Sequence, residues 1–468
     1  MEKTGIDTIF LGDISKRAPF DFGQHPKWKW SVRRQIKERK KNPDLDCLSG
    51  KKVYLSQFVD SQHSEVILIP RDRFIQVLDD IDDPDDPDLI NPAMNFPFSS
   101  ANFFVDLFNN TEGIFYQLAS SGYFARLNSI SQLGYLVPPR PDDWYKDQKI
   151  SFVTPPFGHT RWIHSLIVAI LTDLVLARNG FSKKERAPVV LAAGCHDIAM
   201  PCGGDSTKRI DPKGLDEEEN FFRAMHCYND SVKYWTKKFD FDLVLAWQWV
   251  RGETAFGRLL NMADKICYTA LDCFQLGIER PGKVRSLCLE RPLIMDIWQD
   301  IKFTPDKTDV GFTNAERLFD FLLLRAYEFE ELLYNPYSRT LDLFLKNLLK
   351  PLYKKGIITK EQLLAKNDAW LETTLNKYYP DKVKAYIEPD NFAFEKFLTK
   401  KEAKNFAKGC SGFDHIDHVK KFSVGLDFPV LVKDKLVPIW RMITLDKKQL
   451  LEKISSTHEG YYVYYHRP

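Results

Sequence analysis

Gly158-His-Thr-Arg-Trp-Ile-His-Ser165 and Leu191-Ala-Ala-Gly-Cys-His-Asp197 decide the fold, because each places polar residues at the edge of an apolar helical run. A third stretch of this kind begins at Asp264. Burying an adjacent His-Asp pair at the end of an Ala/Leu-rich helix is costly unless a partner compensates both groups, and a cation does so. Two imidazoles and two carboxylates would leave open positions on a six-coordinate metal, which suits catalysis. The predicted ligands are His164, His196, Asp197 and Asp264.

Each ligand also has a purely structural interpretation. A lone histidine on an apolar helix face, as His164 would be by itself, is usually a satisfied core residue. Separate polar networks would explain the other members one at a time. The joint pattern on three predicted helices therefore carries the metal hypothesis. His159 stands five residues before His164, a poor spacing for one helical face, so we expect it in the preceding loop.

The predicted helix that carries Asp264 has a second polar pattern. Asp264, Tyr268 and Asp272 follow i, i+4, i+8 spacing and share one face, with Lys265 at its flank. This arrangement suits a nucleoside triphosphate, because a cation lies near the metal carboxylate and hydroxyl-binding groups follow. A solvated lysine beside a structural Asp-Tyr pair is the alternative.

Composition indicates an ordinary globular protein. The 468 residues are 44% hydrophobic and 28% charged, and 66 basic against 64 acidic side chains give a net charge of +2. We therefore expect no broad polyanion-binding surface, no membrane association and no nucleic acid as main substrate. The eight cysteines form no CxxC pair, and the N-terminus lacks a signal-peptide pattern, so we expect a soluble, cytoplasmic chain.

Periodicity predicts a mainly α fold with a small α+β lobe at the C-terminal end. Helices are expected at 101–118, 123–133 and 161–178, then from Ser182 as N-cap to His196, and through most of 221–408. The Gly- and Pro-rich segment 201–219 reads as a loop over a site. Strands are expected at 428–440 and 460–465, with a helix at 446–455 between them. We predict an accessory region 1–100, a core 101–345 and a C-terminal region 346–468.

The stretch Asp264-Lys-Ile-Cys-Tyr-Thr-Ala-Leu-Asp272 resembles the matching helix of deoxynucleoside triphosphate triphosphohydrolases, members of the HD phosphohydrolase superfamily. The pattern is closest to the animal enzyme with a SAM domain, and bacterial dGTPases are relatives. Phe124–Gly134, Phe152–Leu166 and Leu324–Glu328 are similar to further family segments, with an apparent insertion at about 136–150. The resemblance covers roughly residues 120–335 and implies an HD-domain helical core.

The resemblance implies a role for each matching position. His164, His196, Asp197 and Asp264 would bind one divalent ion, of which Mn, Fe, Mg, Zn and Co all suit the ligands. The implied reaction is dGTPase-like and would convert a dNTP and water into a deoxynucleoside and triphosphate. The resemblance also implies a homo-oligomer. Arg161, Lys265 and Arg325 would hold phosphates, and the deoxyribose would contact Gln132, Leu133, Tyr268 and Asp272.

This sequence departs from the family pattern in three places. The loop after the His-Asp pair lacks the family's catalytic histidine and offers Asp205 instead, which we interpret as the general acid with Glu218 as its partner. A turn-capping role for Asp205 is the alternative. Phe329 replaces a histidine near the sugar. Ser120 and Asn128 replace residues that bind an activating nucleotide, so a nucleotide effector would act differently here.

Two other functions compete with a dNTP triphosphohydrolase. One is another HD activity, either a phosphodiesterase or an alarmone pyrophosphohydrolase, although Lys265, Tyr268 and Asp272 favour a single nucleotide. The other is a nucleotide-binding sensor with weak catalysis, which would keep the metal and phosphate residues while the altered loop at 198–205 supplies no acid.

Overall fold

The structure is a computed structural model that describes residues 52–53, 69–70, 118, 126–132, 160–279, 297–387, 392–410, 413–425 and 427–466. The chain forms two compact units, Met1–Leu118 and Ala119–Pro468. The described strands of the first unit are β1 (Lys52–Val53) and β2 (Ile69–Pro70), which pair antiparallel. The predicted domain boundary at 100 lies outside the described residues, and the one at 345 falls within helix α17 (Pro336–Lys354).

The second unit is mainly helical, as predicted. Four long helices build its centre: α8 (Arg161–Arg178), α9 (Lys183–Cys195), α14 (Ala255–Glu279) and α16 (Ala315–Glu328). The other helices are α10 (Gly204–Lys208), α11 (Glu217–His226), α12 (Asn229–Phe239), α13 (Leu243–Val250), the π-helix η3 (Phe329–Leu333), α17, α18 (Lys360–Ala365), α19 (Asp368–Tyr378), α20 (Pro380–Ile387), α21 (Lys400–Gly409), the 3₁₀ helix η5 (Ile439–Arg441) and α22 (Leu445–Ser456).

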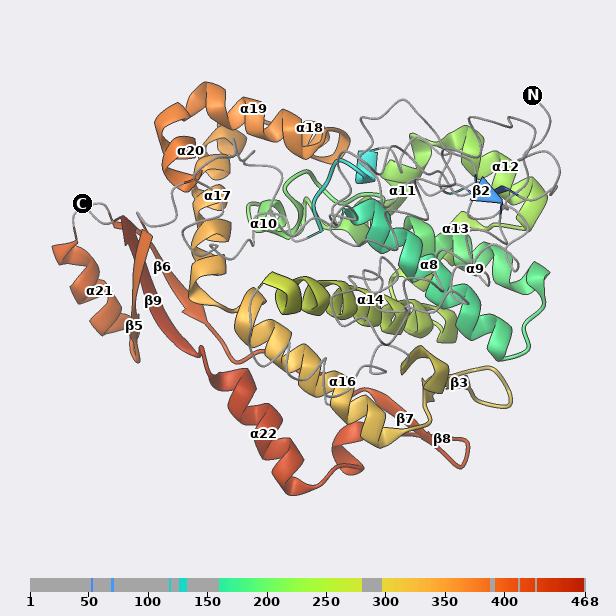
Figure 1. Cartoon of the computed structure of the whole chain (residues 1–468). Helices are drawn as coiled ribbons and strands as arrows, with labels where there is room; N and C mark the ends of the chain where they lie inside the picture. The colour runs from blue at the N-terminus through green and yellow to red at the C-terminus, as the bar shows by residue number, and fades with distance from the viewer. Residues whose placement is uncertain are drawn as a thin grey trace. The chain divides into compact units, whose positions relative to one another are not determined.

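Local signals set the ends of the two helices that carry the predicted ligands. The Thr160 side chain accepts a hydrogen bond from the Ile163 amide and caps α8. Ser182 and Glu185 form the capping box that starts α9, and His196 is its C-cap. Helix α8 packs against α9 and α14, and α14 packs against α16 (Figure 1). Their shared apolar core places the polar ends of α8 and α9 beside the middle of α14.

Two small sheets complete the unit. One has the order β3 (Ile301–Phe303), β4 (Val310–Phe312), β7 (Pro429–Val432) and β8 (Lys435–Pro438). Its β4–β7 pair is parallel and joins Phe312 to Val430, whereas the outer pairs are antiparallel. The other sheet places β9 (Gly460–His466) between β5 (Phe392–Phe397) and β6 (Phe413–Val419), antiparallel to both.

Many of the predicted elements are confirmed, and the structure corrects several others. The predicted strands correspond to β7, β8 and β9, and the helix between them is α22. The expectation of helices through 221–408 is wrong at β3, β4 and β5, where short strands find partners distant in sequence. The expected loop at 201–219 contains the short helix α10. The helix predicted at 123–133 is wrong over most of its described part: Arg126 and Leu127 are helical, but the chain turns at 128–130 and Ser131 forms an isolated β-bridge with Thr160. Residues 101–117 of the other predicted helix and the insertion at 136–150 lie outside the described residues.

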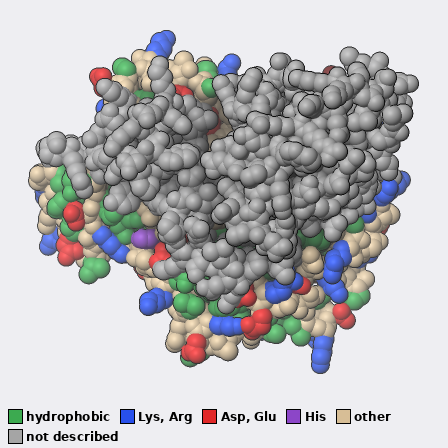
Figure 2. All heavy atoms as spheres, viewed as in Figure 1, with side chains coloured by type: hydrophobic (Ala, Val, Ile, Leu, Met, Phe, Trp, Pro, Cys, Tyr) green, Lys and Arg blue, Asp and Glu red, His purple; other side chains and the backbone are tan. Residues whose placement is uncertain are grey.

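The described surface shows no dominant charge on the face in view. Lys and Arg side chains alternate there with Asp and Glu (Figure 2). Within the part of the chain that the structure describes, no helix has the length and apolar character needed to cross a bilayer.

Candidate metal centre and cavity

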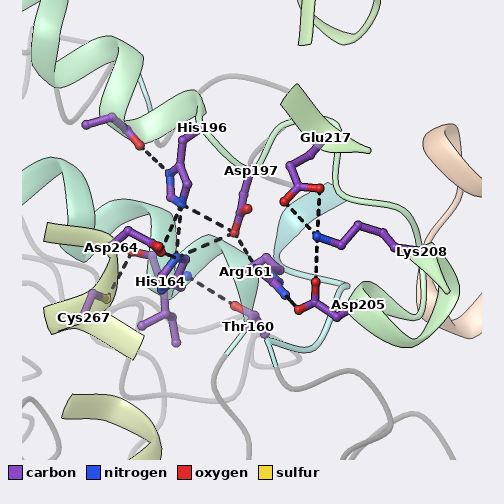
Figure 3. A network of polar contacts seen from close by, with 12 residues as sticks. Thr160, Arg161, His164, His196, Asp197, Asp205, Lys208, Glu217, Asp264 and Cys267 are labelled. Carbon is purple, nitrogen blue, oxygen red and sulfur yellow. Dashed lines mark hydrogen bonds and ion pairs between the residues drawn. The ribbon is translucent and has the colours of Figure 1, made fainter. Parts of the chain in front are cut away.

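Three predicted ligands from three helices meet at one point. His164 Nε2 lies 3.2 Å from His196 Nε2 and 3.0 Å from Asp264 Oδ1, and His196 Nε2 lies 3.7 Å from the same carboxylate oxygen. One ligand atom from each residue lies within 4.8 Å of the others (Figure 3). The set combines the end of α9, the first turn of α8 and the middle of α14, as the packing of these helices requires.

The chemistry of these atoms fits a cation. His196 Nδ1 lies 2.7 Å from the carbonyl oxygen of Ala193, so this ring nitrogen donates and Nε2 of the neutral ring carries a lone pair. That lone pair points at a second imidazole and a carboxylate. Burial disfavours a charged His196, but Asp197 and Asp264 outweigh it and raise its pKa to about 9. A divalent ion held among these ligands would supply the positive charge that the two carboxylates favour at this point.

Asp197, the fourth predicted ligand, lies between the two histidines and the guanidinium of Arg161. Its Oδ2 atom lies 3.7 Å from Nε2 of both histidines and 2.9 Å from Arg161 Nη1. Arg161 and the two histidines keep the pKa of this buried carboxyl below its usual range despite desolvation. Asp197 is therefore ionised, and it stands where it can complete a four-residue ligand set.

A chain of alternating charges extends from the cluster. Arg161 Nη2 lies 2.8 Å from Asp205 Oδ2, and Lys208 Nζ lies 2.7 Å from the other oxygen of Asp205 and 2.8 Å from Glu217 (Figure 3). Lys208 was not among the residues predicted from the sequence. Its position three residues after Asp205 could have indicated this ion pair, because residues i and i+3 are neighbours on a helix.

These ion pairs affect the predicted general acid. Burial would raise the pKa of Asp205, but Arg161 and Lys208 outweigh burial and hold it well below its ordinary value. The Asp205 carboxyl is also half exposed, and it is a carboxylate at neutral pH. In contrast, burial raises the pKa of both Glu217 and Glu218, with neighbouring carboxylates adding to the shift at Glu218. The ion pairs thus place Asp205 beside Arg161 as a carboxylate, which argues against the predicted role of Asp205 as general acid, whereas the pKa of Glu218 is shifted upward.

The charged groups line a cavity of about 260 Å³. Most of the predicted site residues border it, and His164 lies beneath, with no exposed surface. Leu133 lies outside the described residues, and Lys265 and Arg325 flank the cavity without lining it. The lining residues are Gln132, Arg161, His196, Asp197, Met200, Asp205, Glu217, Glu218, Val250, Leu260, Asn261, Asp264, Tyr268, Asp272 and Leu333.

The two predicted phosphate-binding cations near α14 are held by aromatic rings. Lys265 Nζ lies 5.2 Å from the centre of the Phe428 ring. The Arg325 guanidinium lies 4.9 Å from the Tyr268 ring and 4.4 Å from the Phe329 ring. Arg325 is 7% exposed, and its Nε and Nη1 atoms have no hydrogen-bond partner among the residues that the structure describes. Buried donors of this kind are costly unless a ligand satisfies them.

Asp272 has a carboxyl neighbour that the sequence analysis gave no role. Glu328, at the end of α16, is fully buried beside Asp272 and Thr269. Burial raises the pKa of Glu328 to about 7, and burial together with Glu328 raises that of Asp272 well above its usual value. The pair therefore retains a proton at neutral pH and presents both donor and acceptor groups at this end of the cavity.

Comparisons with known proteins support the fold. No family model and no curated protein matches the chain. Among solved structures, a hypothetical protein from Aquifex aeolicus is similar with a TM-score of 0.56 and 19% identity, over 75% of this chain and 92% of that one. A phosphohydrolase from Bacteroides thetaiotaomicron is similar with a TM-score of 0.55 and 16% identity, over 75% of this chain and 95% of that one. At these identities the likeness concerns the fold alone.

Proposed function

We propose that this chain is a metal-dependent phosphohydrolase that converts a deoxynucleoside triphosphate and water into a deoxynucleoside and triphosphate. One observation carries the proposal. The ligand atoms of His164, His196 and Asp264 converge at the border of a cavity that also holds Arg161. The fold shared with a phosphohydrolase supports the hydrolase class.

The charges of the cavity support an anionic ligand bound together with a cation. Its border carries the carboxylates of Asp197 and Asp264, which would repel a phosphate by themselves. A divalent ion held by His164, His196, Asp197 and Asp264 would neutralise this repulsion, polarise the phosphate and lower the pKa of water. Arg161 adds a fixed positive charge, because Asp197 and Asp205 orient its guanidinium.

The arrangement along α14 supports a nucleotide that lies parallel to this helix. Tyr268 and Asp272 follow Asp264 on the same face and border the cavity. Arg325 stacks on Tyr268, and its Nε and Nη1 atoms have no partner among the described residues, so its guanidinium would hold phosphate oxygens. Gln132 and Asp272 would bind the sugar hydroxyl beyond them.

In the proposed reaction the oxygen of water adds to the α-phosphorus, and the bond from phosphorus to the 5′ oxygen breaks. Arg161 and Arg325 would balance charge on the phosphate oxygens in the transition state. Glu218 would give its proton to the departing 5′ oxygen, because burial favours its protonated form. Asp205 would keep Arg161 in place.

Product analysis tests this proposal. The purified protein is incubated with each dNTP and NTP and with Mn²⁺ or Mg²⁺, and products are separated by anion exchange. We expect deoxynucleoside and intact triphosphate from dNTPs, and loss of both products in Asp264→Asn. Asp173→Asn is the matched control, since it breaks a buried ion pair with Arg186 on the same helix bundle, about 13 Å along α8 from His164. Release of monophosphate or pyrophosphate, or no turnover, would refute this reaction.

A further inference from the structure

A single carboxylate from the C-terminal half of the chain joins two segments that border the cavity. Asp368 is the first residue of α19 and is 2% exposed. Its Oδ1 atom accepts a hydrogen bond of 2.7 Å from the Gly203 amide, and its Oδ2 atom accepts one of 2.9 Å from the Ser131 amide. These partners stand 165 and 237 residues away in the sequence.

Both amides belong to backbone that presents cavity residues. Ser131 directly precedes Gln132, which borders the cavity. Gly203 has φ of +77° and is the N-cap of α10, two residues before Asp205. Glycine adopts positive φ about as readily as negative φ, so the hydrogen bond from the Gly203 amide to Asp368 contributes to selecting this conformation.

Arg126 connects the same segments through a second set of hydrogen bonds. Its Nη1 and Nη2 atoms donate to the carbonyl oxygens of Ile198, at 3.3 Å, and Met200, at 2.5 Å, and its Nε atom donates to that of Lys366, at 3.2 Å. Segments 126–132, 198–203 and 366–368 thus form one hydrogen-bonded junction behind the cavity, with Asp368 as its buried acceptor.

We infer that Asp368 is a positioning residue, which sets the places of Gln132 and Asp205 relative to the metal ligands through the backbone amides of Ser131 and Gly203. The inference rests on the proposed function only for its effect on turnover. An ionised carboxylate suits the task because it offers two acceptors and no donor. His164 and Asp264 lie on α8 and α14, and His196 and Asp197 lie at and just after the C-terminal end of α9. The two hydrogen bonds accepted by Asp368 come from Ser131 and Gly203 and not from a metal ligand, so the residue acts on the substrate side of the site.

Asp368→Asn in the full-length chain is the test, since it keeps the size of the side chain but turns an N–H group toward one of the two amides. Asn367→Ala is the matched control: it removes the adjacent cap of α19, where the Asn367 Oδ1 atom accepts from the Trp370 amide at 3.1 Å, and leaves both tethers intact. Asp368→Glu, with both acceptor oxygens retained, is a second variant in case the Asn form does not fold.

Hydrogen exchange at the amides of residues 131 and 203 is the direct measurement. We expect exchange there to accelerate roughly 10- to 100-fold in Asp368→Asn, since a buried amide loses its partner, and much less in Asp368→Glu and Asn367→Ala. Mn²⁺ affinity, measured by titration calorimetry, should be unchanged within about threefold in all of them, because no ligand helix loses a contact. kcat/KM for the dNTP should fall about tenfold or more only in Asp368→Asn.

Two outcomes would overturn the inference. One is equal exchange at the two amides in Asp368→Asn and Asn367→Ala. The other is selective loss of Mn²⁺ affinity in Asp368→Asn, which would place its effect at the metal ligands. The exchange measurement needs no substrate. It therefore tests whether Asp368 holds the amides of Ser131 and Gly203 even if the wild-type protein hydrolyses no dNTP and the proposed function fails.

Discussion

Replacing Arg161 by Met should destabilise the protein in a way that depends on the metal. The side chain is 5% exposed and pairs with Asp197 and Asp205 at 2.9 and 2.8 Å. Its loss leaves the buried Asp197 carboxylate beside Asp264 with no guanidinium, which costs about 3–5 kcal/mol. The half-exposed Asp205 carboxylate adds at most about 1 kcal/mol, because water solvates it.

A divalent ion bound by His164, His196 and Asp264 would offset much of this loss by compensating Asp197. The free energy of unfolding of wild type and Arg161→Met is therefore measured by urea titration, in EDTA and in saturating Mn²⁺. Arg186→Met is the matched control, since it also leaves a buried carboxylate, Asp173, without its cation, but far from the cluster. An equal loss for Arg161→Met in both conditions, or a loss below about 1 kcal/mol in EDTA, would refute the reasoning.

Three further predictions concern the ligands, the junction and the proton donor. Asp264→Asn should weaken Mn²⁺ binding about 100-fold or more in titration calorimetry, because one charged ligand becomes neutral, and binding at wild-type affinity would exclude this carboxylate as a ligand. Burial raises the pKa of Asp368 to about 6 against about 4 in the unfolded chain, so the folded state holds the extra proton between these values. Asp368 should therefore contribute a fall of about 3 kcal/mol in the free energy of unfolding between about pH 4 and about pH 7, measured by urea titration as the difference between wild type and Asp368→Asn, and an equal pH dependence of the two proteins would contradict this. Glu218→Gln should lower kcat about 100-fold and abolish the decline of activity at high pH, whereas the same change at the neighbouring Glu219 should do neither.

Local signals in the sequence account for much of the fold. The apolar run of α8, Ser182 as the N-cap of α9 and the shared face of Asp264, Tyr268 and Asp272 on α14 were predicted, because helix hydrogen bonds and caps join residues at most four positions apart. The strand pattern of β9 was clear for a similar reason, since alternating aromatic residues indicate a half-buried strand. In contrast, β4 pairs with β7, which lies more than a hundred residues later in the sequence, and no local pattern predicts this contact.

For the site, the residue types and helix positions of His164, His196 and Asp264 were enough to predict a metal cluster, because buried histidines and carboxylates at helix ends need a compensating charge. Tertiary structure alone decided the electrostatic role of each remaining group. Asp205 on α10 and Glu218 on α11 are both carboxylic acids that border the cavity, yet Arg161 and Lys208 hold the pKa of the first below its ordinary value, whereas partial desolvation and neighbouring carboxylates raise the pKa of the second. A pKa depends on the charges and solvent within a few ångströms, and packing of distant segments, as at Asp368, determines which charges those are.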